Sequence, residues 1–559
     1  MKPAGGTRRR PLLSAAAAAL VCGILLSAWE WLMLVTRSMY APTGLIRHLE
    51  VILLATAIYG LFAFLFILPF HLPYWLKQRP FFFAKLLILP VLISSCGIVN
   101  RYTEQMSRKL PVTGAGRNLI LVTLDTVRDD FLGCYGHPTI KTPFLDRFSR
   151  QGALFADVVC PAPMTTPSHA SLLTATIPRR HGAADNRYRL GADNVSLAEL
   201  LVQAGYTTAA FVSCYPLNHM FGLNQGFMIY DDIFIERGGW RELVPVSMVN
   251  RWRRRGLLER DAGMVNRAIL PWLETHRDHT FFLWIHYFDA HAPYTPPPPY
   301  RGMYRDAMPP AAGRLTPPAA VEIDKACRMA PGEEAYPLLP IERYAGEISR
   351  VDRALEDVFM RLEQLDMLRD SVVVVTADHG ESLGEHEYFF SHGALLFDPS
   401  ITVPLLASLP DDRASRLLAA QVRLIDLAPT ILDYLGLPIH ERMEGTSLLP
   451  RMKGGREQVL PALIENIGII LAPGAVKMRG LRAYDWKRLE GADECAGLYD
   501  LRADPNEMHN LCGTESELSA TMRDMTKDGF ARASGERIDS PVLLDEEVRD
   551  KLQQLGYIR

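Results

Sequence analysis

The chain has 559 residues, a length that exceeds one ordinary domain and allows a large hydrophobic core. Hydrophobic residues make up 48% and charged residues 22%, which excludes a chain that is disordered throughout. With 60 Lys and Arg against 63 Asp and Glu, the net charge of −3 gives no reason to expect a nucleic acid partner. Eight cysteines without a CxxC spacing indicate neither a disulfide framework nor a cysteine-based zinc site.

Three long runs with few charged residues occupy the first hundred positions. They are residues 11–29, 51–76 and 81–100. A helix that spans a bilayer needs about 20 apolar residues, so each run is long enough. A cleaved signal peptide is an alternative for the first run alone, but the two further runs favour a multi-pass anchor. We expect about three transmembrane helices in residues 1–100 and a linker at residues 101–116.

Positive charges around these runs predict their orientation. An arginine cluster precedes the first run, and Lys77, Arg79 and Lys85 lie at the link between the second and the third. Basic residues stay on the cytoplasmic side of a membrane, so three spans place the remainder of the chain outside. The basic residues within 101–109 oppose this orientation mildly. We expect a multi-pass protein of the bacterial inner membrane whose larger part is extracytoplasmic.

Continuous apolar runs alternate with helical patterns beyond the anchor. The runs, typical of strands buried on both faces of a parallel sheet, are residues 118–124, 206–213, 281–286 and 372–376. Helical spacing marks residues 197–204 and 344–368. The alternation predicts an α/β fold with a doubly wound, mixed but mainly parallel sheet flanked by helices. We assign residues 117–455 to this domain and residues 456–559 to a small C-terminal α+β subdomain and tail.

Polar residues with metal-binding side chains follow three of these runs. Asp125 follows the first run directly. Asp289 and His291 follow the third, and Asp378 and His379 follow the fourth. Ligands of open α/β sheets bind at the carboxyl ends of the strands, where these side chains meet. Carboxylate and imidazole groups from three strand ends favour a metal site over separate structural carboxylates.

Six short segments form a recognisable series along the α/β domain. They are LDTVRDDFLGCYG, APMTTPSHASLLTAT, RRHG, FDAHAPY, TADHGESLGEH and SHG. Their order and spacing between about residues 117 and 449 resemble the sulfatase family of the alkaline phosphatase superfamily. The later segment LYDLRADPNEMHNL resembles the C-terminal part of the same family. The resemblance implies an enzyme that hydrolyses or transfers an anionic ester.

The resemblance also implies a divalent metal ion. Its ligands would be Asp125, Thr165, Asp378 and His379. The family often has a second aspartate directly after the first, and Thr126 occupies that position here. With one carboxylate fewer, calcium, manganese and zinc all remain candidates.

The nucleophile position departs from the sulfatase pattern. Sulfatases carry there a Cys or Ser that is oxidised to formylglycine, at the head of a C-x-P-S-R block. Here Thr165 carries a methyl group that excludes formylglycine, and the catalytic candidate His169 replaces the final Arg. The Lys-x-His motif that sulfatases use on sulfate is missing near residues 213–218. Family members with Thr instead attack phosphorus with its hydroxyl, whereas a simple helix N-cap is the alternative for Thr165.

Three further residues have two possible roles. Asp289, His291 and His392 suit either a second metal ion or direct contact with the substrate anion, and we favour substrate contact. We interpret His386 as structural, and Asn186 either as a donor to the anion or as a turn residue.

The sequence therefore predicts a membrane-anchored, metal-dependent hydrolase or phosphotransferase that acts on phosphate or sulfate esters through Thr165. The anchor suits a lipid, a glycan or an envelope polymer as the anionic ester substrate. One alternative is a sulfatase that works without formylglycine. The other is a catalytically inactive envelope protein that binds partners.

Overall fold

The computed structural model describes residues 116–234, 259–305, 307, 320–327, 336, 338–466, 477–491, 494–514 and 517–532. The predicted anchor at residues 1–100 lies outside this part of the chain. Within the described part, no helix has both the length and the apolar character needed to cross a bilayer. All described residues belong to one compact unit.

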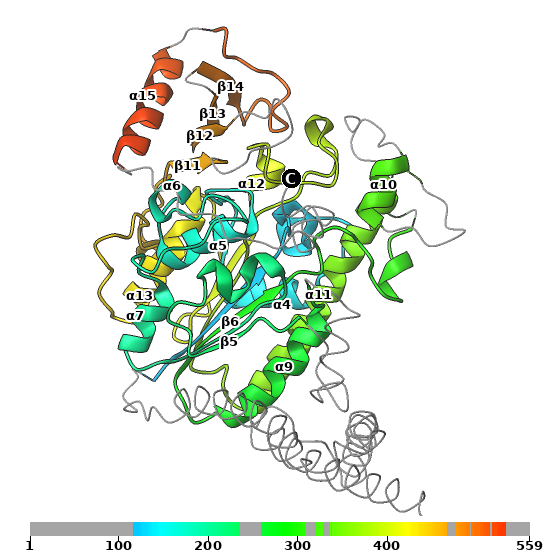
Figure 1. The fold of residues 1–559 in the computed structure, drawn as a ribbon, viewed down its shortest axis with the longest axis vertical. Helices are drawn as coiled ribbons and strands as arrows, with labels where there is room; N and C mark the ends of the chain where they lie inside the picture. The colour runs from blue at the N-terminus through cyan, green and yellow to red at the C-terminus, as the bar shows by residue number, and fades with distance from the viewer. Residues whose placement is uncertain are drawn as a thin grey trace, which may run out of the picture. The chain divides into compact units, whose positions relative to one another are not determined.

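An eight-stranded sheet forms the centre of this unit (Figure 1). In spatial order the strands are β5 (Ile229–Asp231), β4 (Thr207–Phe211), β6 (Phe281–Tyr287), β1 (Asn118–Leu124), β7 (Ser371–Ala377), β8 (Leu405–Ser408), β2 (Ala153–Phe155) and β9 (Arg416–Leu418). The first five strands are parallel, whereas β8 is antiparallel to both β7 and β2. The prediction of a mixed, mainly parallel sheet is confirmed.

The central strands are buried on both faces, which explains their continuous apolar runs. Every residue of β6 and of β7 is buried, and so is all of β1 after Asn118. Such strands carry hydrophobic residues at consecutive positions because both faces of the sheet are covered by helices. The carboxyl ends of β4, β6, β1 and β7 consequently lie side by side in a single row.

Helices cover the two faces of the sheet. Their bounds are α4 (Pro143–Phe148), α5 (Thr165–Thr174), α6 (Pro178–His181), α7 (Leu197–Gln203), α9 (Ala262–Thr275), α10 (Ala320–Cys327), α11 (Leu339–Gln364), α12 (Asp398–Ile401), α13 (Leu427–Tyr434) and α14 (Leu449–Met452). Figure 1 shows α4, α9 and α11 on one side of the sheet and α5, α7 and α13 on the other. Helix α11 begins earlier than the predicted residue 344, because Pro340 in its first turn is compatible with a helix start. A short parallel pair, β3 (Val158–Val159) and β10 (Val422–Arg423), lies apart from the large sheet.

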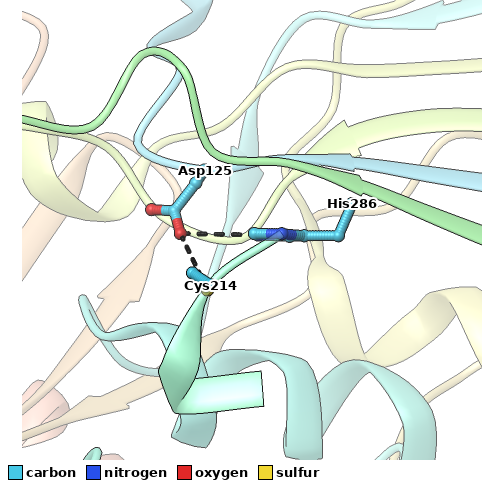
Figure 2. A group of neighbouring side chains, drawn as sticks. All are labelled: Asp125, Cys214 and His286. Carbon is cyan, nitrogen blue, oxygen red and sulfur yellow. Dashed lines mark hydrogen bonds and ion pairs between the residues drawn. The ribbon is translucent and has the colours of Figure 1, made fainter. Parts of the chain in front are cut away.

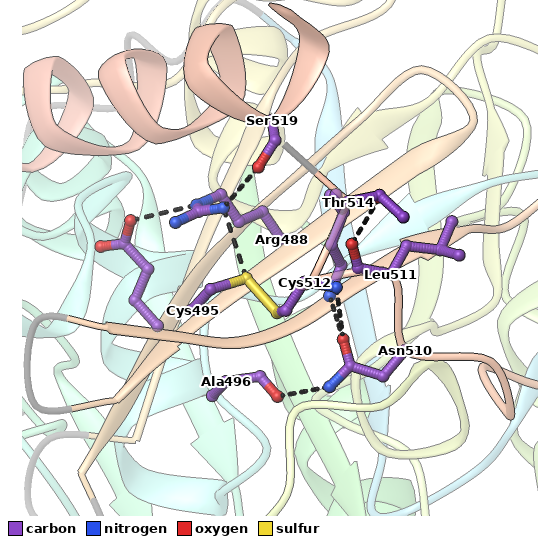
Figure 3. The surroundings of a disulfide bond; sticks show 10 residues. Arg488, Cys495, Ala496, Asn510, Leu511, Cys512, Thr514 and Ser519 are labelled. Atoms are coloured by element: carbon purple, nitrogen blue, oxygen red, sulfur yellow. Dashed lines mark hydrogen bonds and ion pairs between the residues drawn. A yellow bond between two sulfur atoms is a disulfide. The ribbon is translucent and has the colours of Figure 1, made fainter. Parts of the chain in front are cut away.

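The C-terminal part is a separate antiparallel sheet with one helix. It contains β11 (Ala462–Glu465), β12 (Met478–Ala483), β13 (Trp486–Gly491), β14 (Glu494–Asp500) and α15 (Glu517–Arg532). A disulfide joins Cys495 on β14 to Cys512 (Figure 3). Arg488 on β13 donates to the Sγ atom of Cys495 and to Ser519 on α15. This is the α+β arrangement that the sequence predicts after the larger sheet.

A buried ion network connects this C-terminal sheet to the larger part, and we call it the Asp398 network. Arg482 on β12 lies 2.8 Å from Asp157 and 3.0 Å from Asp398. Lys487 on β13 is fully buried, and its Nζ atom lies 2.6 Å from Asp398 and 2.6 Å from Glu507. Every charge in this network therefore has an opposite charge supplied by the chain.

Candidate active site

Metal-binding side chains from the row of strand ends converge at the carboxyl edge of the sheet. Asp125 follows β1, and Asp378 and His379 follow β7. All three are fully buried, and their ligand atoms lie within 4.8 Å of one another. The Nε2 atom of His379 lies 3.4 Å from Asp378 Oδ2 and 3.9 Å from Asp125 Oδ1. The structure thus brings together three of the four predicted metal ligands.

The charges at this edge fit a divalent cation. Asp125 Oδ1 and Asp378 Oδ2 are buried and accept no hydrogen bond from the described residues. Burial raises the pKa of Asp125 to about 7, and burial together with Asp125 raises the pKa of Asp378. Buried oxygens without donors are costly unless a cation neutralises them. The donor set of two carboxylates and one imidazole is one that calcium, manganese and zinc accept.

The imidazole of His379 is oriented as a metal ligand. Its Nδ1 atom lies 2.9 Å from the carbonyl oxygen of Gly380, which can only accept. The proton therefore resides on Nδ1, and the lone pair of Nε2 faces the two carboxylates. Burial lowers the pKa of His379, but Asp378 and Asp125 more than offset it, so the pKa is raised. A second hydrogen bond of this kind is typical of a metal-bound histidine.

Thr165 begins helix α5 beside this group. Its Oγ1 atom lies 3.5 Å from Nε2 of His379, and the residue is fully buried. The N-cap of α5 is Met164, and Thr165 is the first helical residue. The alternative that Thr165 is only a helix N-cap is therefore wrong. Its hydroxyl stands at the positive end of a ten-residue helix, where an anion is stabilised.

His169 has a positioning role and does not contact the substrate position. The carbonyl oxygen of Thr165 can only accept, so Nδ1 of His169 donates to it at 2.8 Å. Nε2 of the neutral ring then accepts from the Thr123 hydroxyl at 3.0 Å, and the indole of Trp284 donates to the same hydroxyl oxygen at 2.9 Å. Burial lowers the pKa of His169 to about 3, so the ring is neutral. The expectation that His169 is catalytic is corrected: both of its nitrogens are committed to holding the first turn of α5.

His291 and His392 lie close to the metal-binding group. Their ring centroids are 5.0 Å apart, and the ring of His392 is 4.4 Å from that of His379. His392 Nδ1 contacts Glu381 Oε1 at 3.1 Å. Glu381 is fully buried, also accepts from Tyr294, and has a pKa that burial raises to about 7. The sequence prediction missed Glu381, although it stands in the quoted ADHGE segment.

Asp289 is engaged elsewhere. Its carboxylate accepts from the backbone N–H of Ala262 at 3.2 and 2.9 Å, at the start of α9. Arg350 Nη1 lies 2.8 Å from its Oδ1 atom. A second metal ion on Asp289, His291 and His392 therefore lacks its carboxylate, and contact of the two histidines with the substrate anion stays a prediction.

Two other expectations concern residues near the site. His386 stacks on Phe397 with centroids 3.5 Å apart, which agrees with a structural role. Asn186 Oδ1 accepts from the backbone N–H of Thr166 at 2.8 Å. Asn186 thus holds the second residue of α5.

Sequence reasoning also missed the two residues nearest to the other side of Asp125. His286 lies near the end of β6, and Cys214 follows β4 (Figure 2). His286 Nε2 lies 3.4 Å and Cys214 Sγ lies 3.8 Å from Asp125 Oδ2. The signal for His286 is a titratable side chain inside a strand that is otherwise apolar. Cys214 has no comparable signal, because only the neighbouring position of β4 and β6 brings it to the site.

Comparisons with known proteins agree with this architecture. The family model described as sulfatase matches residues 117–437, and that of the N-sulphoglucosamine sulphohydrolase C-terminal region matches residues 384–529. Arylsulfatase K of Gallus gallus is 24% identical over 431 residues, which cover 70% of this chain and 78% of that protein.

Two solved structures share the fold at low sequence identity. The phosphonate monoester hydrolase of Agrobacterium radiobacter has a TM-score of 0.59 and 21% identity, covering 75% of this chain and 95% of that one. BT4656 in complex with its substrate D-glucosamine-2-N,6-O-disulfate has a TM-score of 0.61 and 19% identity, covering 75% and 98%. The sulfatase model spans β1 to α13 and includes Asp125, Thr165 and Asp378. The chain belongs to the sulfatase family and is a sulfatase-like hydrolase.

Proposed function

We propose that this protein is a metal-dependent enzyme that cleaves or transfers phosphate esters through Thr165. The observation that carries the proposal is the position of the Thr165 hydroxyl, buried at the start of α5 and 3.5 Å from His379. Because Thr cannot become formylglycine, its hydroxyl must act as the nucleophile itself. Phosphate is the ester that matches a hydroxyl nucleophile in this family.

Asp125, Thr165, Asp378 and His379 would hold the divalent cation, and calcium, manganese and zinc are the candidates. Such a cation neutralises an anionic ester and lowers the pKa of a hydroxyl group. The chain's own residues supply the orientation. His169 holds the carbonyl oxygen of Thr165, and Asn186 holds the next backbone N–H, so the hydroxyl keeps one direction.

Thr165 Oγ1 attacks phosphorus, forms a new oxygen–phosphorus bond and loses its proton to water. The bond between phosphorus and the departing oxygen breaks, and the phosphoryl group stays on Thr165 as an ester. Water then releases phosphate in a hydrolase, whereas an acceptor hydroxyl takes the phosphoryl group in a transferase. The N-terminus of α5, His291 and His392 would stabilise the anionic oxygens.

A sulfatase that works without formylglycine is the second candidate. The similarity to arylsulfatase K and to a structure with a bound sulfated sugar favours it. In both candidates the substrate is an anionic ester, and a glycan, a lipid or an envelope polymer would suit a membrane-bound enzyme.

The proposal includes an anchor in residues 1–100 that spans the bacterial inner membrane. The catalytic domain would lie on the extracytoplasmic side of that membrane. The Cys495–Cys512 disulfide supports this location, because disulfides persist in oxidising compartments. An alkaline phosphatase reporter fused after about residue 110 should be active. Activity of a reporter that functions only in the cytoplasm at that junction would contradict the orientation.

The chemical part is tested with the purified full-length chain on aryl phosphate, phosphodiester, phosphonate and sulfate esters. We expect turnover of a phosphate ester and a phosphoryl adduct on Thr165, mapped by mass spectrometry with a slow substrate. If the protein turns over sulfate esters and no phosphate ester, the proposed phosphate substrate is wrong and the second candidate, the sulfatase, is correct. A metal-loaded, folded chain that turns over none of them would favour the inactive binding protein.

A further inference from the structure

Asp125 has ligand groups on two sides. On one side lie Asp378 and His379, which form the proposed metal site. On the other side lie Cys214 and His286, and the ligand atoms of these two and of Asp125 are all within 4.8 Å of one another (Figure 2). All three residues are fully buried. This second group combines a carboxylate, a thiol and an imidazole from the ends of three neighbouring strands, β1, β4 and β6.

Two of the three distances in this group match the edges of a tetrahedral zinc site, and the third is within 4.8 Å. Zinc binds Cys at about 2.3 Å and His or Asp at about 2.1 Å, so ligand atoms in a tetrahedron are separated by about 3.6 Å for sulfur–oxygen and about 3.4 Å for nitrogen–oxygen. The observed separations from Asp125 Oδ2 are 3.8 Å to Cys214 Sγ and 3.4 Å to His286 Nε2. Thus little movement is needed to close these three ligands around one ion.

His286 is oriented for this role. Its Nε2 atom is buried and lies 3.4 Å from Asp125 Oδ2 without a hydrogen bond of good geometry within the described residues. Its Nδ1 atom lies 2.6 Å from the hydroxyl oxygen of Ser213 and accepts from the backbone N–H of the same residue at 3.4 Å. A metal ion at Nε2 would move the imidazole proton to Nδ1, and the Ser213 hydroxyl oxygen would then accept it. Three protein ligands leave a fourth position open, the arrangement of catalytic zinc sites.

A competing group contains the same imidazole, but its second histidine, His169, has no ring nitrogen available to bind a metal ion. His169, His286 and Asp378 also lie within ligand distance of one another. Both nitrogens of His169 are committed, to Thr165 and to Thr123. Therefore His286 is directed to Asp125 and Cys214 and not to a site that includes His169.

We propose that Asp125, Cys214 and His286 bind a second divalent cation, zinc, next to the one at Asp125, Asp378 and His379. Thiolate and imidazole ligands select zinc over calcium and manganese, whereas the first position has oxygen ligands and one imidazole. Binding replaces the proton of the Cys214 thiol, which in the metal-free arrangement donates to Asp125. The inference rests on the proposed metal-dependent function, because the two positions share Asp125.

The test is the metal content of the full-length chain. The purified protein is stripped with chelator, loaded with zinc alone and dialysed, and zinc per chain is measured by elemental analysis. We expect two zinc ions in the wild type and one in both Cys214→Ser and His286→Gln. Loading with cobalt should give a thiolate-to-cobalt absorption band in the near ultraviolet that Cys214→Ser abolishes.

Cys160→Ser is the matched control. Cys160 is likewise buried, but its Sγ atom donates to the carbonyl oxygen of Ala162, so this variant should keep two zinc ions and the cobalt band. The single ion retained by Cys214→Ser also demonstrates that the variant is folded. One zinc ion in wild type and Cys214→Ser alike, without a thiolate band, would overturn the second site and leave a hydrogen-bonded chain from Ser213 through His286 to Asp125. That result leaves the proposed function standing if phosphate turnover persists, whereas no bound metal and no turnover would overturn both.

Discussion

Two buried charge clusters in this molecule are built in opposite ways. In the Asp398 network, burial alone would raise the pKa of Asp398, but Arg482 and Lys487 outweigh burial and hold it well below the usual range. At the carboxyl edge of the sheet, no lysine or arginine of the described residues forms an ion pair with Asp125 or Asp378. Burial there raises the pKa of Asp125 to about 7.

The contrast distinguishes a charge cluster that stabilises the fold from one that can bind a ligand. A buried carboxylate that is paired with cations of its own chain needs nothing from solution, and its loss leaves other charges uncompensated. A buried carboxylate without such partners must either remain protonated or take a cation from solution. The first arrangement holds the C-terminal sheet in place, and the second is typical of a ligand site.

The largest expected effect belongs to the carboxyl edge and concerns turnover. Thr165→Ala should lower kcat by at least about 10³-fold, because it removes the oxygen atom that we propose as the nucleophile. Metal binding should persist through the remaining ligands, as measured by elemental analysis. Thr165→Ser should retain part of the activity, because it keeps the hydroxyl.

Thr166→Ala is the matched control for this variant. Thr166 is the next residue of α5, but its hydroxyl donates to the carbonyl oxygen of Pro216 and not toward the metal-binding group. Most of the turnover should therefore remain. Near-normal activity in Thr165→Ala would exclude Thr165 as the nucleophile.

The next effect belongs to the Asp398 network and concerns stability. Asp398→Ala leaves Lys487 and Arg482 buried with fewer opposite charges, so the free energy of unfolding should fall by about 3–5 kcal/mol. Asp412→Ala, which breaks the surface pair with Arg416, should cost less than about 1 kcal/mol. Urea denaturation measures both variants, and equal losses would mean that burial of the network adds nothing.

A pH series tests the charge state of the carboxyl edge. Without metal, the stability contributed by protonated Asp125 is fully present below the pKa of about 3.9 that an aspartate has in an unfolded chain, and it is lost as pH rises through about 7. The metal-free chain should therefore lose up to a few kcal/mol across this window relative to Asp125→Asn, in which nothing titrates at that position. Thermal unfolding in chelator measures the difference. If the stabilities of wild type and Asp125→Asn change equally with pH, another group of the chain already neutralises the charge of the Asp125 carboxylate.

Metal should reverse this pH dependence. Bound cation displaces the proton from Asp125, so affinity and the resulting stabilisation should increase with pH over the same window. The same unfolding series with saturating zinc provides the comparison. A chain stabilised equally at both ends of the window would contradict a carboxylate ligand that is protonated when metal-free.

The sequence alone could predict the parts of the site that follow directly from a strand. Asp125 and Asp378 come immediately after fully buried apolar runs, so their position at the carboxyl edge depends only on the sheet being parallel. Asp289 stands two residues beyond the end of β6, and its prediction as a possible ligand of a second metal ion did not foresee the partners of its carboxylate. There the local N-terminus of α9 and Arg350 compete for its carboxylate.

Residues whose role depends on the spatial order of the strands could not be predicted. Cys214 reaches Asp125 only because β4 lies beside β6 and β6 beside β1, an order that differs from the order along the chain. The role of His169 likewise depends on the carbonyl oxygen of Thr165 and on the Thr123 hydroxyl, which together set the directions of the hydrogen bonds at its two ring nitrogens. Such directions follow from tertiary contacts and leave no local pattern.

The smallest expected effect concerns the disulfide of the C-terminal sheet. This disulfide is a covalent link, whereas the Asp398 network consists of ion pairs. Cys495 and Cys512 are 17 residues apart, and a loop of this length restricts the unfolded chain by about 3 kcal/mol. The double variant Cys495→Ser/Cys512→Ser should lose up to this amount in urea denaturation. Its metal content and kcat should match wild type, because the disulfide touches Arg488 and none of the groups around Asp125. A loss of bound metal in this variant would mean that the two regions are coupled, and that the fully paired network also supports the cluster around Asp125 that we propose to bind the cation.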